Sequence, residues 1–165
     1  MNKLGLHFVS AIFFCFSTTL LFSSKVISQP MPPFKMILSD NKVFNAVDLP
    51  KGKPVVLIYF DPDCDHCQKL MKGFFKKINS FKKAEIVMVT FKSIMELAAF
   101  EKKYNTHNYT NIKVGTEGNS FYLRNYYQLI KMPFTALYDK NKNLSYSCSQ
   151  ETGVDDLIKR LKTFK

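Results

Sequence analysis

The sequence predicts an α/β fold in which a central mixed β-sheet is flanked by helices. Short apolar runs alternate along the chain with longer segments whose apolar residues recur at helical spacing, a pattern typical of this class. The run Pro54–Phe60 is apolar on both faces, as expected of a central strand covered by helices. With 165 residues and no internal repeats, the chain is long enough for one domain with a substantial core.

The first 28 residues predict a signal peptide rather than a part of this domain. A short basic start precedes Leu4–Phe22, which is almost wholly apolar or small. Val26 and Ser28 suit the signal-peptidase pocket, so we expect cleavage after Ser28. A retained membrane anchor is the alternative, because about nineteen apolar residues come close to the lower limit for a membrane span.

The domain itself is expected to begin with a β-hairpin. Residues 29–33 (QPMPP) form a Pro-rich, extended tether that leads into the domain of residues 34–165. Phe34–Leu38 and Val43–Val47 flank a cluster of turn-forming residues, which predicts two paired strands. The strand Pro54–Phe60 follows this hairpin.

The remainder of the domain is predicted to alternate between helices and strands. Ser93 and Glu96 have the spacing of a capping box, which marks the start of a helix. Besides a helix that begins at the cysteine pair described below, the predicted helices are Ser93–Tyr104, Ser120–Ile130 and Val154–Phe164. The predicted later strands are Ile86–Phe91, Ile112–Val114, Phe134–Tyr138 and Leu144–Cys148.

The formal net charge of +11 is spread over lysines that are interleaved with apolar residues. Such a pattern is typical of the solvated faces of helices. No dense basic stripe or known nucleic-acid motif accompanies it, so no nucleic-acid partner is predicted. A peripheral contact with an anionic membrane remains open.

Cys64 and Cys67 give the strongest functional signal. They follow a strand and open a helix, where free backbone N–H groups and the helix dipole stabilise a thiolate. We therefore expect Cys64 to attack a disulfide and Cys67 to resolve the mixed disulfide, with a Cys64–Cys67 disulfide as the product. Asp65 and His66 lie between them. A protonated His66 is expected to favour the thiolate and make the pair more oxidising, whereas Asp65 is expected to have the opposite effect.

A second signal is Pro133, which stands directly before the predicted strand Phe134–Tyr138. Proline at the start of an interior strand removes a ladder hydrogen bond, so its presence there needs a reason.

Together, the motif FDPDCDHC (residues 60–67) and the segment MPFTALYD (residues 132–139) resemble the thioredoxin superfamily. The closer resemblance is to its exported TlpA/ResA-like redoxin branch, which also has a leading hairpin and an inserted helix and strand, here Ser93–Val114. The resemblance covers most of residues 34–164. It implies a thioredoxin-like fold in which Pro133 is a cis-proline that faces the cysteine pair and, with Met132 before it, helps to bind substrate.

Three positions depart from that family pattern. Asp63 replaces the usual Trp before the first cysteine, Ile58 stands where thioredoxins have a buried Asp, and Leu70 stands where many TlpA-like proteins have an acidic residue. Those acids help to remove the proton from the resolving cysteine. The proton acceptor for Cys67 is therefore unassigned, with His66 as one candidate.

The sequence agrees less well with other functions of the cysteine pair. A purely structural disulfide over such a short loop would stabilise the fold little. Zinc would need two further ligands, and neither His107 nor the distant Cys148 has matching spacing, so no metal site or cofactor is predicted. Cys148 is instead expected to be a buried apolar residue of the last strand, with pairing to a partner or to glutathione as the alternative. A peroxidase would place its attacking cysteine in a different loop.

The sequence thus predicts an exported thiol–disulfide oxidoreductase of the periplasm or cell envelope. It would reduce or exchange disulfides in extracytoplasmic proteins. Its partners would be protein disulfide or thiol substrates, together with an electron donor or acceptor in the envelope. The alternative is a non-enzymatic binding module of the same fold, such as a copper carrier. The direction of electron flow is left open.

Overall fold

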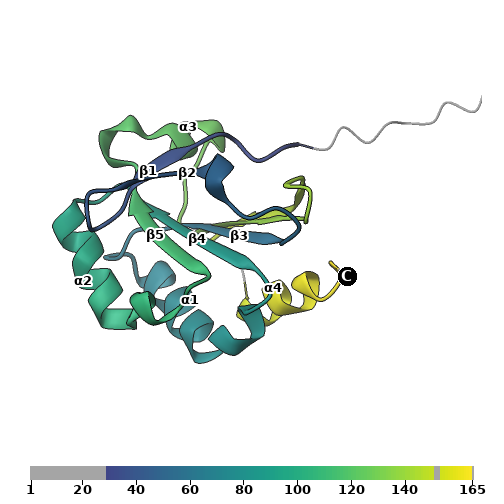
Figure 1. Ribbon diagram of the computed structural model, residues 1–165. Helices are drawn as coiled ribbons and strands as arrows, with labels where there is room; N and C mark the ends of the chain where they lie inside the picture. Colours follow the sequence, from purple (N-terminus) through teal and green to yellow (C-terminus); the bar gives the residue numbers. More distant parts are fainter. Residues whose placement is uncertain (1–28, 151–152, 165) are drawn as a thin grey trace, which may run out of the picture.

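In the computed structural model, residues 29–150 and 153–164 are described, and they form a seven-stranded mixed sheet with helices on both faces (Figure 1). The strands are β1 (Lys35–Ile37), β2 (Val43–Asn45), β3 (Val55–Tyr59), β4 (Glu85–Thr90), β5 (Ile112–Thr116), β6 (Phe134–Tyr138) and β7 (Leu144–Ser149). The helices are α1 (Asp65–Lys76), α2 (Ile94–Tyr104), α3 (Tyr122–Tyr126) and α4 (Val154–Leu161). The predicted signal peptide, residues 1–28, lies outside the described residues.

The sheet has the strand order β2-β1-β5-β4-β3-β6-β7. β3, β4 and β5 are parallel, whereas β6 runs antiparallel to β3 and β7 antiparallel to β6. The leading hairpin joins the other edge, where β1 pairs antiparallel with β5. Because the parallel strands end at the same edge of the sheet, the loops after β3 and β4 meet there, and ligands commonly bind at this edge in open α/β sheets.

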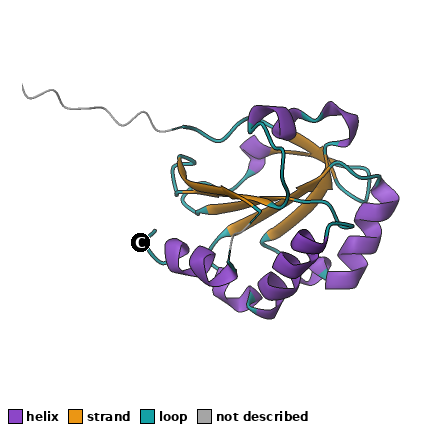
Figure 2. Cartoon of the chain, turned by 180° about the vertical axis from the view of Figure 1, so that it is seen from behind, coloured by secondary structure: helices purple, strands orange, loops and turns teal. Residues whose placement is uncertain are grey.

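Two hydrophobic cores lie on opposite faces of the sheet, which helices cover on both sides (Figure 2). One face of the sheet is covered by α1, α2 and α4, which contribute Phe74, Phe100 and Leu157, respectively, to the first core. On the other face, Leu123 of α3 and Ala46 of a 3-10 turn cover the strands. β3 is buried along its whole length because both cores enclose it, which agrees with its continuous apolar sequence.

Several local predictions are confirmed. The Ser93–Glu96 capping box forms at the start of α2: the Glu96 N–H donates to Ser93 Oγ at 3.3 Å, and the Ser93 N–H donates to Glu96 Oε2 at 3.0 Å. β6 has the predicted bounds.

Within the described residues, no helix combines the length and the apolar character needed to cross a membrane.

The predicted helix Ser120–Ile130 is wrong in length. Only Tyr122–Tyr126 is α-helical, because Phe121 and Gln128 adopt positive φ angles of 46° and 51° that interrupt the helix on either side. The buried carboxylate of Glu117 accepts a hydrogen bond from the Leu123 N–H at 2.8 Å and so fixes this short turn.

Other element boundaries differ from the prediction by a few residues. Val47 lies in the 3-10 turn Ala46–Asp48 and not in the second hairpin strand. The last helix ends at Leu161 instead of Phe164. Conversely, β5 continues two residues beyond its predicted end at Val114.

Candidate active site

Cys64 lies just beyond the carboxyl end of β3, at the N-cap of α1. Its backbone carbonyl accepts the first helical hydrogen bond, from the Gln68 N–H at 2.9 Å. The thiol is half-buried and stands beside the unpaired N–H groups of the first helical turn. These groups and the helix dipole stabilise negative charge, so the position favours a nucleophilic thiolate at Cys64.

Cys67, one helical turn further, has a different environment. It is fully buried under α1, and its Sγ accepts a hydrogen bond from the backbone N–H of Asp61 at 3.5 Å. Burial raises the pKa of the Cys67 thiol to about 12, because the apolar surroundings disfavour the thiolate. Both cysteines are free thiols in this structure, so their disulfide remains a prediction.

The loop before β6 lies against the exposed side of the cysteine pair. The Met132–Pro133 peptide bond is cis, and the Cys64 thiol donates to the carbonyl oxygen of Met132 at 3.8 Å. The Gln150 N–H donates to the Pro133 carbonyl at 2.6 Å and ties this loop to the end of β7. The structure therefore brings Cys64, Cys67, Met132 and Pro133 together from distant parts of the chain.

Asp65 and His66 occupy the first turn of α1, and both side chains are exposed. His66 is thus in contact with solvent, whereas Cys67 is buried. The N-cap Cys64 forms no side-chain capping bond, and Asp61 Oδ1 accepts a hydrogen bond from the Asp63 N–H at 2.9 Å.

Lys92 is a site residue that sequence reasoning missed. Its Nζ lies 2.6 Å from Asp63 Oδ2, 3.5 Å from Asp61 Oδ1 and 3.6 Å from Glu96 Oε1. The hydrogen bond with Asp63 is the main cause that raises the pKa of Lys92 above its ordinary value. Lys92 follows β4 as Asp61 follows β3, so the adjacency of these two parallel strands was the available signal. Lys92 therefore partly neutralises the negative charge of Asp61 and Asp63, which precede Cys64 in the sequence.

A small cavity of about 10 Å³ lies beside Cys67 and is bordered by Asp61, Gln68 and Tyr104. The Tyr104 hydroxyl is buried and has no hydrogen-bond partner among the described residues. A space of this size is near the minimum for one water molecule. Asp61 contacts Cys67 through its backbone N–H and borders the same cavity, whereas His66 does not line it, which makes Asp61 a better-placed proton acceptor than His66.

Cys148 is not part of this arrangement. It lies on β7 opposite Thr135 of β6 and is half-buried, so the expectation of a fully buried residue is wrong. β7 is the edge strand of the sheet, and its residues alternate between half-buried and exposed.

Within residues 29–150 and 153–164, no group of three or more His, Cys, Asp or Glu side chains is placed to hold a metal ion.

The fold is shared with solved structures of low sequence identity. The pneumococcal exposed lipoprotein thioredoxin Etrx1 from Streptococcus pneumoniae is 21% identical, with a TM-score of 0.61 over 80% of this chain and 99% of that chain. A secreted Mycobacterium tuberculosis disulfide oxidoreductase is 17% identical, with a TM-score of 0.66 over 79% and 96%. A peroxiredoxin-like protein from Aquifex aeolicus is 15% identical, with a TM-score of 0.69 over 84% and 86%.

No curated protein sequence matches the chain. Residues 27–151, by contrast, match the model of the AhpC/TSA family. This match includes both cysteines and the proline loop, and it agrees with the thioredoxin-like arrangement of sheet and helices. The chain is therefore a redoxin of the thioredoxin superfamily and belongs to the AhpC/TSA family.

Proposed function

We propose that the protein is an exported thiol–disulfide oxidoreductase that acts on protein disulfides through Cys64 and Cys67. One observation carries this proposal: the half-buried Cys64 occupies the N-cap position of α1 and faces the Met132–Pro133 loop, while Cys67 is buried one turn further along the helix. The first thiol is accessible and the second is protected, as sequential attack and resolution require.

The reaction balances with these two cysteines alone. The Cys64 thiolate attacks one sulfur of a substrate disulfide, and the other substrate sulfur leaves as a thiolate that takes up a proton. Cys67 then loses its proton and attacks Cys64 Sγ, which breaks the mixed disulfide. The products are a reduced substrate and a Cys64–Cys67 disulfide, which an external dithiol must reduce before the next turnover.

Each remaining site residue has a proposed part in this reaction. Met132 and Pro133 lie where an extended substrate segment would pass Cys64, and the backbone of the half-buried Met132 would bind that segment while the buried Pro133 would shape the loop. Asp65 and His66, exposed on the first turn of α1, would tune the stability of the Cys64 thiolate. Asp61 would accept the proton of Cys67 through a water molecule in the adjoining cavity.

Export rests on the N-terminal sequence and agrees with the structural neighbours. The apolar segment Leu4–Phe22 has the character of a signal peptide or anchor. Two of the similar structures are described as an exposed lipoprotein and as a secreted oxidoreductase. We therefore assign the protein to the periplasm or cell envelope.

Trapping experiments test the proposed roles. Cys67→Ser should accumulate a mixed disulfide between Cys64 and a disulfide-containing protein substrate, because the resolving step is removed. Cys64→Ser should form no adduct and should lose disulfide reductase activity. Full activity of Cys64→Ser would refute the assignment.

The same preparation distinguishes two other functions. One similar structure is described as peroxiredoxin-like, so peroxide consumption should be measured in parallel. Stoichiometric copper binding that needs both cysteines, without disulfide exchange, would favour a metal carrier instead.

A further inference from the structure

A large cavity opens at the end of the sheet opposite to the cysteines. Its volume is about 690 Å³, and we call it the basal cavity. Apolar side chains, including Leu161 and Phe164, form its floor, and four exposed lysines surround it: Lys82, Lys83, Lys140 and Lys162. None of the residues that line it is acidic. The basal cavity therefore combines an apolar interior with a cationic rim.

The carboxylates closest in sequence to the four rim lysines already have other partners. Glu85 is buried and paired with Lys53, whose Nζ lies 2.7 Å from Glu85 Oε1. Asp139 Oδ1 accepts hydrogen bonds from the backbone N–H groups of Asn141 and Asn143 in the turn that it begins.

The four rim lysines remain available for an external anion. Within the described part of the chain, none of them forms an ion pair with a carboxylate.

The position of the basal cavity is set by the strands. Pro54 and Ala84 line it, and they come directly before β3 and β4, whereas Cys64 follows the other end of β3. The five residues of β3, roughly 17 Å of extended chain, thus lie between the cavity and the cysteine site. A surface bound at the basal cavity would leave Cys64 facing away from it.

The described chain also begins at this end of the molecule. The carbonyl of Gln29 accepts from the Leu144 N–H at 2.7 Å, and the Met31 N–H donates to the Lys142 carbonyl at 2.9 Å. Lys142 Nζ in turn donates to the carbonyl of Lys53, next to the cavity residue Gly52. Figure 1 shows the start of the described chain and its C-terminal end on the same side of the molecule. Gln29, the residue that follows the predicted signal peptide or anchor, therefore lies at the same end of the molecule as the basal cavity.

We propose that the basal cavity binds the headgroups of anionic phospholipids at a membrane surface and thereby orients the domain with Cys64 pointing away from the bilayer. The lysine amines match the phosphate groups, and the apolar floor accommodates the upper part of an acyl chain. This contact is independent of the redox reaction, because no cysteine-site residue lines the basal cavity.

Hydrogen–deuterium exchange of the full chain with lipid nanodiscs tests the proposal. Discs of phosphatidylcholine containing phosphatidylglycerol are compared with discs of phosphatidylcholine alone, at physiological salt so that long-range attraction is screened. We expect slower exchange in residues 78–84 and 158–164 with the anionic discs and no such protection with the neutral discs. Peptides around Cys64 should exchange equally in both.

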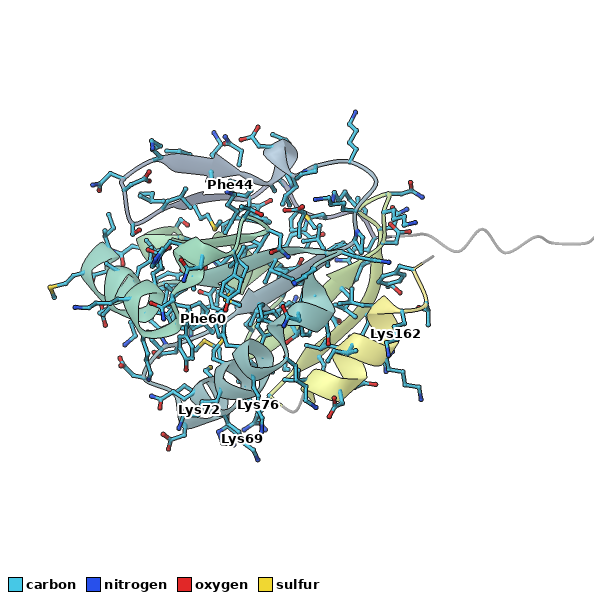
Figure 3. The ribbon with its side chains drawn as sticks, turned by 60° about the horizontal axis from the view of Figure 1, so that its bottom comes forward. Phe44, Phe60, Lys69, Lys72, Lys76 and Lys162 are labelled. Atoms are coloured by element: carbon cyan, nitrogen blue, oxygen red, sulfur yellow. The ribbon has the colours of Figure 1, made fainter. Side chains whose placement is uncertain are left out.

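A matched pair of variants distinguishes binding at the basal cavity from a general effect of the protein's positive charge. Lys82→Gln, Lys83→Gln and Lys162→Gln together should abolish the protection. The control is Lys69→Gln, Lys72→Gln and Lys76→Gln, which removes the same charge from the outer face of α1, away from Lys162, which directly follows α4 (Figure 3).

The control variant should retain the protection. Protection that is absent, that appears equally with neutral discs, or that is lost equally in both variants would overturn the proposal. In each of these cases the trapping experiment on Cys64 and Cys67 is unaffected, so the two proposals fail separately.

Discussion

The backbone N–H of Asp61 donates a hydrogen bond to the Sγ of Cys67 at 3.5 Å, which links the loop after β3 to the buried thiol one turn inside α1. This contact provides some polar stabilisation of a sulfur that is otherwise enclosed by apolar side chains. Asp61 also borders the cavity beside Cys67. The proposed resolving step, in which Cys67 must lose its proton, depends on this relationship.

The two cysteines should differ strongly in their alkylation by iodoacetamide. Burial raises the pKa of Cys67 to about 12, and only the thiolate reacts, so Cys67 should remain almost unmodified at pH 8. Its rate should still rise about tenfold per pH unit between pH 8 and pH 10, because the pH stays below its pKa throughout. Peptide mass spectrometry of the folded protein measures both rates. Equal reactivity at pH 8 would mean that Cys67 is not protected.

Asp61→Asn should slow the resolution of the mixed disulfide by about tenfold or more, since it removes a proton acceptor and retains the backbone hydrogen bond to Cys67. The initial attack by Cys64 should change much less. Stopped-flow kinetics with a protein disulfide separates the two steps. Asp65→Asn is the matched control, because Asp65 is exposed and does not border the cavity. Equal slowing in both variants would argue for general electrostatics instead of proton transfer.

Lys92→Gln should lower the reduction potential of the cysteine pair. The change removes the cation that neutralises Asp61 and Asp63 next to Cys64, so the thiolate of the reduced form becomes less stable. The shift should be small, on the order of 10 mV, and should shrink further at high salt. Equilibration with glutathione buffers measures it. An unchanged or higher potential in Lys92→Gln, relative to the exposed control Lys69→Gln, would contradict this electrostatic role.

Thr135→Val should stabilise the domain. The Thr135 side chain is fully buried on β6, and its hydroxyl has no hydrogen-bond partner among the described residues, so its burial is unfavourable. Valine has nearly the same shape and suits a strand. We expect the free energy of unfolding to rise by about 1 kcal/mol in urea titrations. A loss of stability would reveal that the hydroxyl is satisfied by a water molecule.

The sheet and the cysteine position were predictable because their signals are local. β6 and the capping box of α2 follow directly from apolar runs and from the Ser93–Glu96 spacing. The interruption of the helix at Phe121 and Gln128 was not predictable, since neither residue type favours positive φ and tertiary packing imposes it.

In the same way, the role of Lys92 depends on strand adjacency. It pairs with Asp63, which is 29 residues earlier in the sequence, and no local pattern connects the two positions. The cavity shared by Asp61 and Tyr104 likewise forms only when α2 packs beside α1.

The most direct test of the account is the redox equilibrium of the Cys64–Cys67 pair in glutathione buffers, in a Cys148→Ser background that removes the third described thiol. We predict one reversible two-electron couple, with a potential between about −120 and −270 mV, that is abolished by Cys67→Ser. The absence of a reversible couple, or a couple that persists in Cys67→Ser, would contradict it.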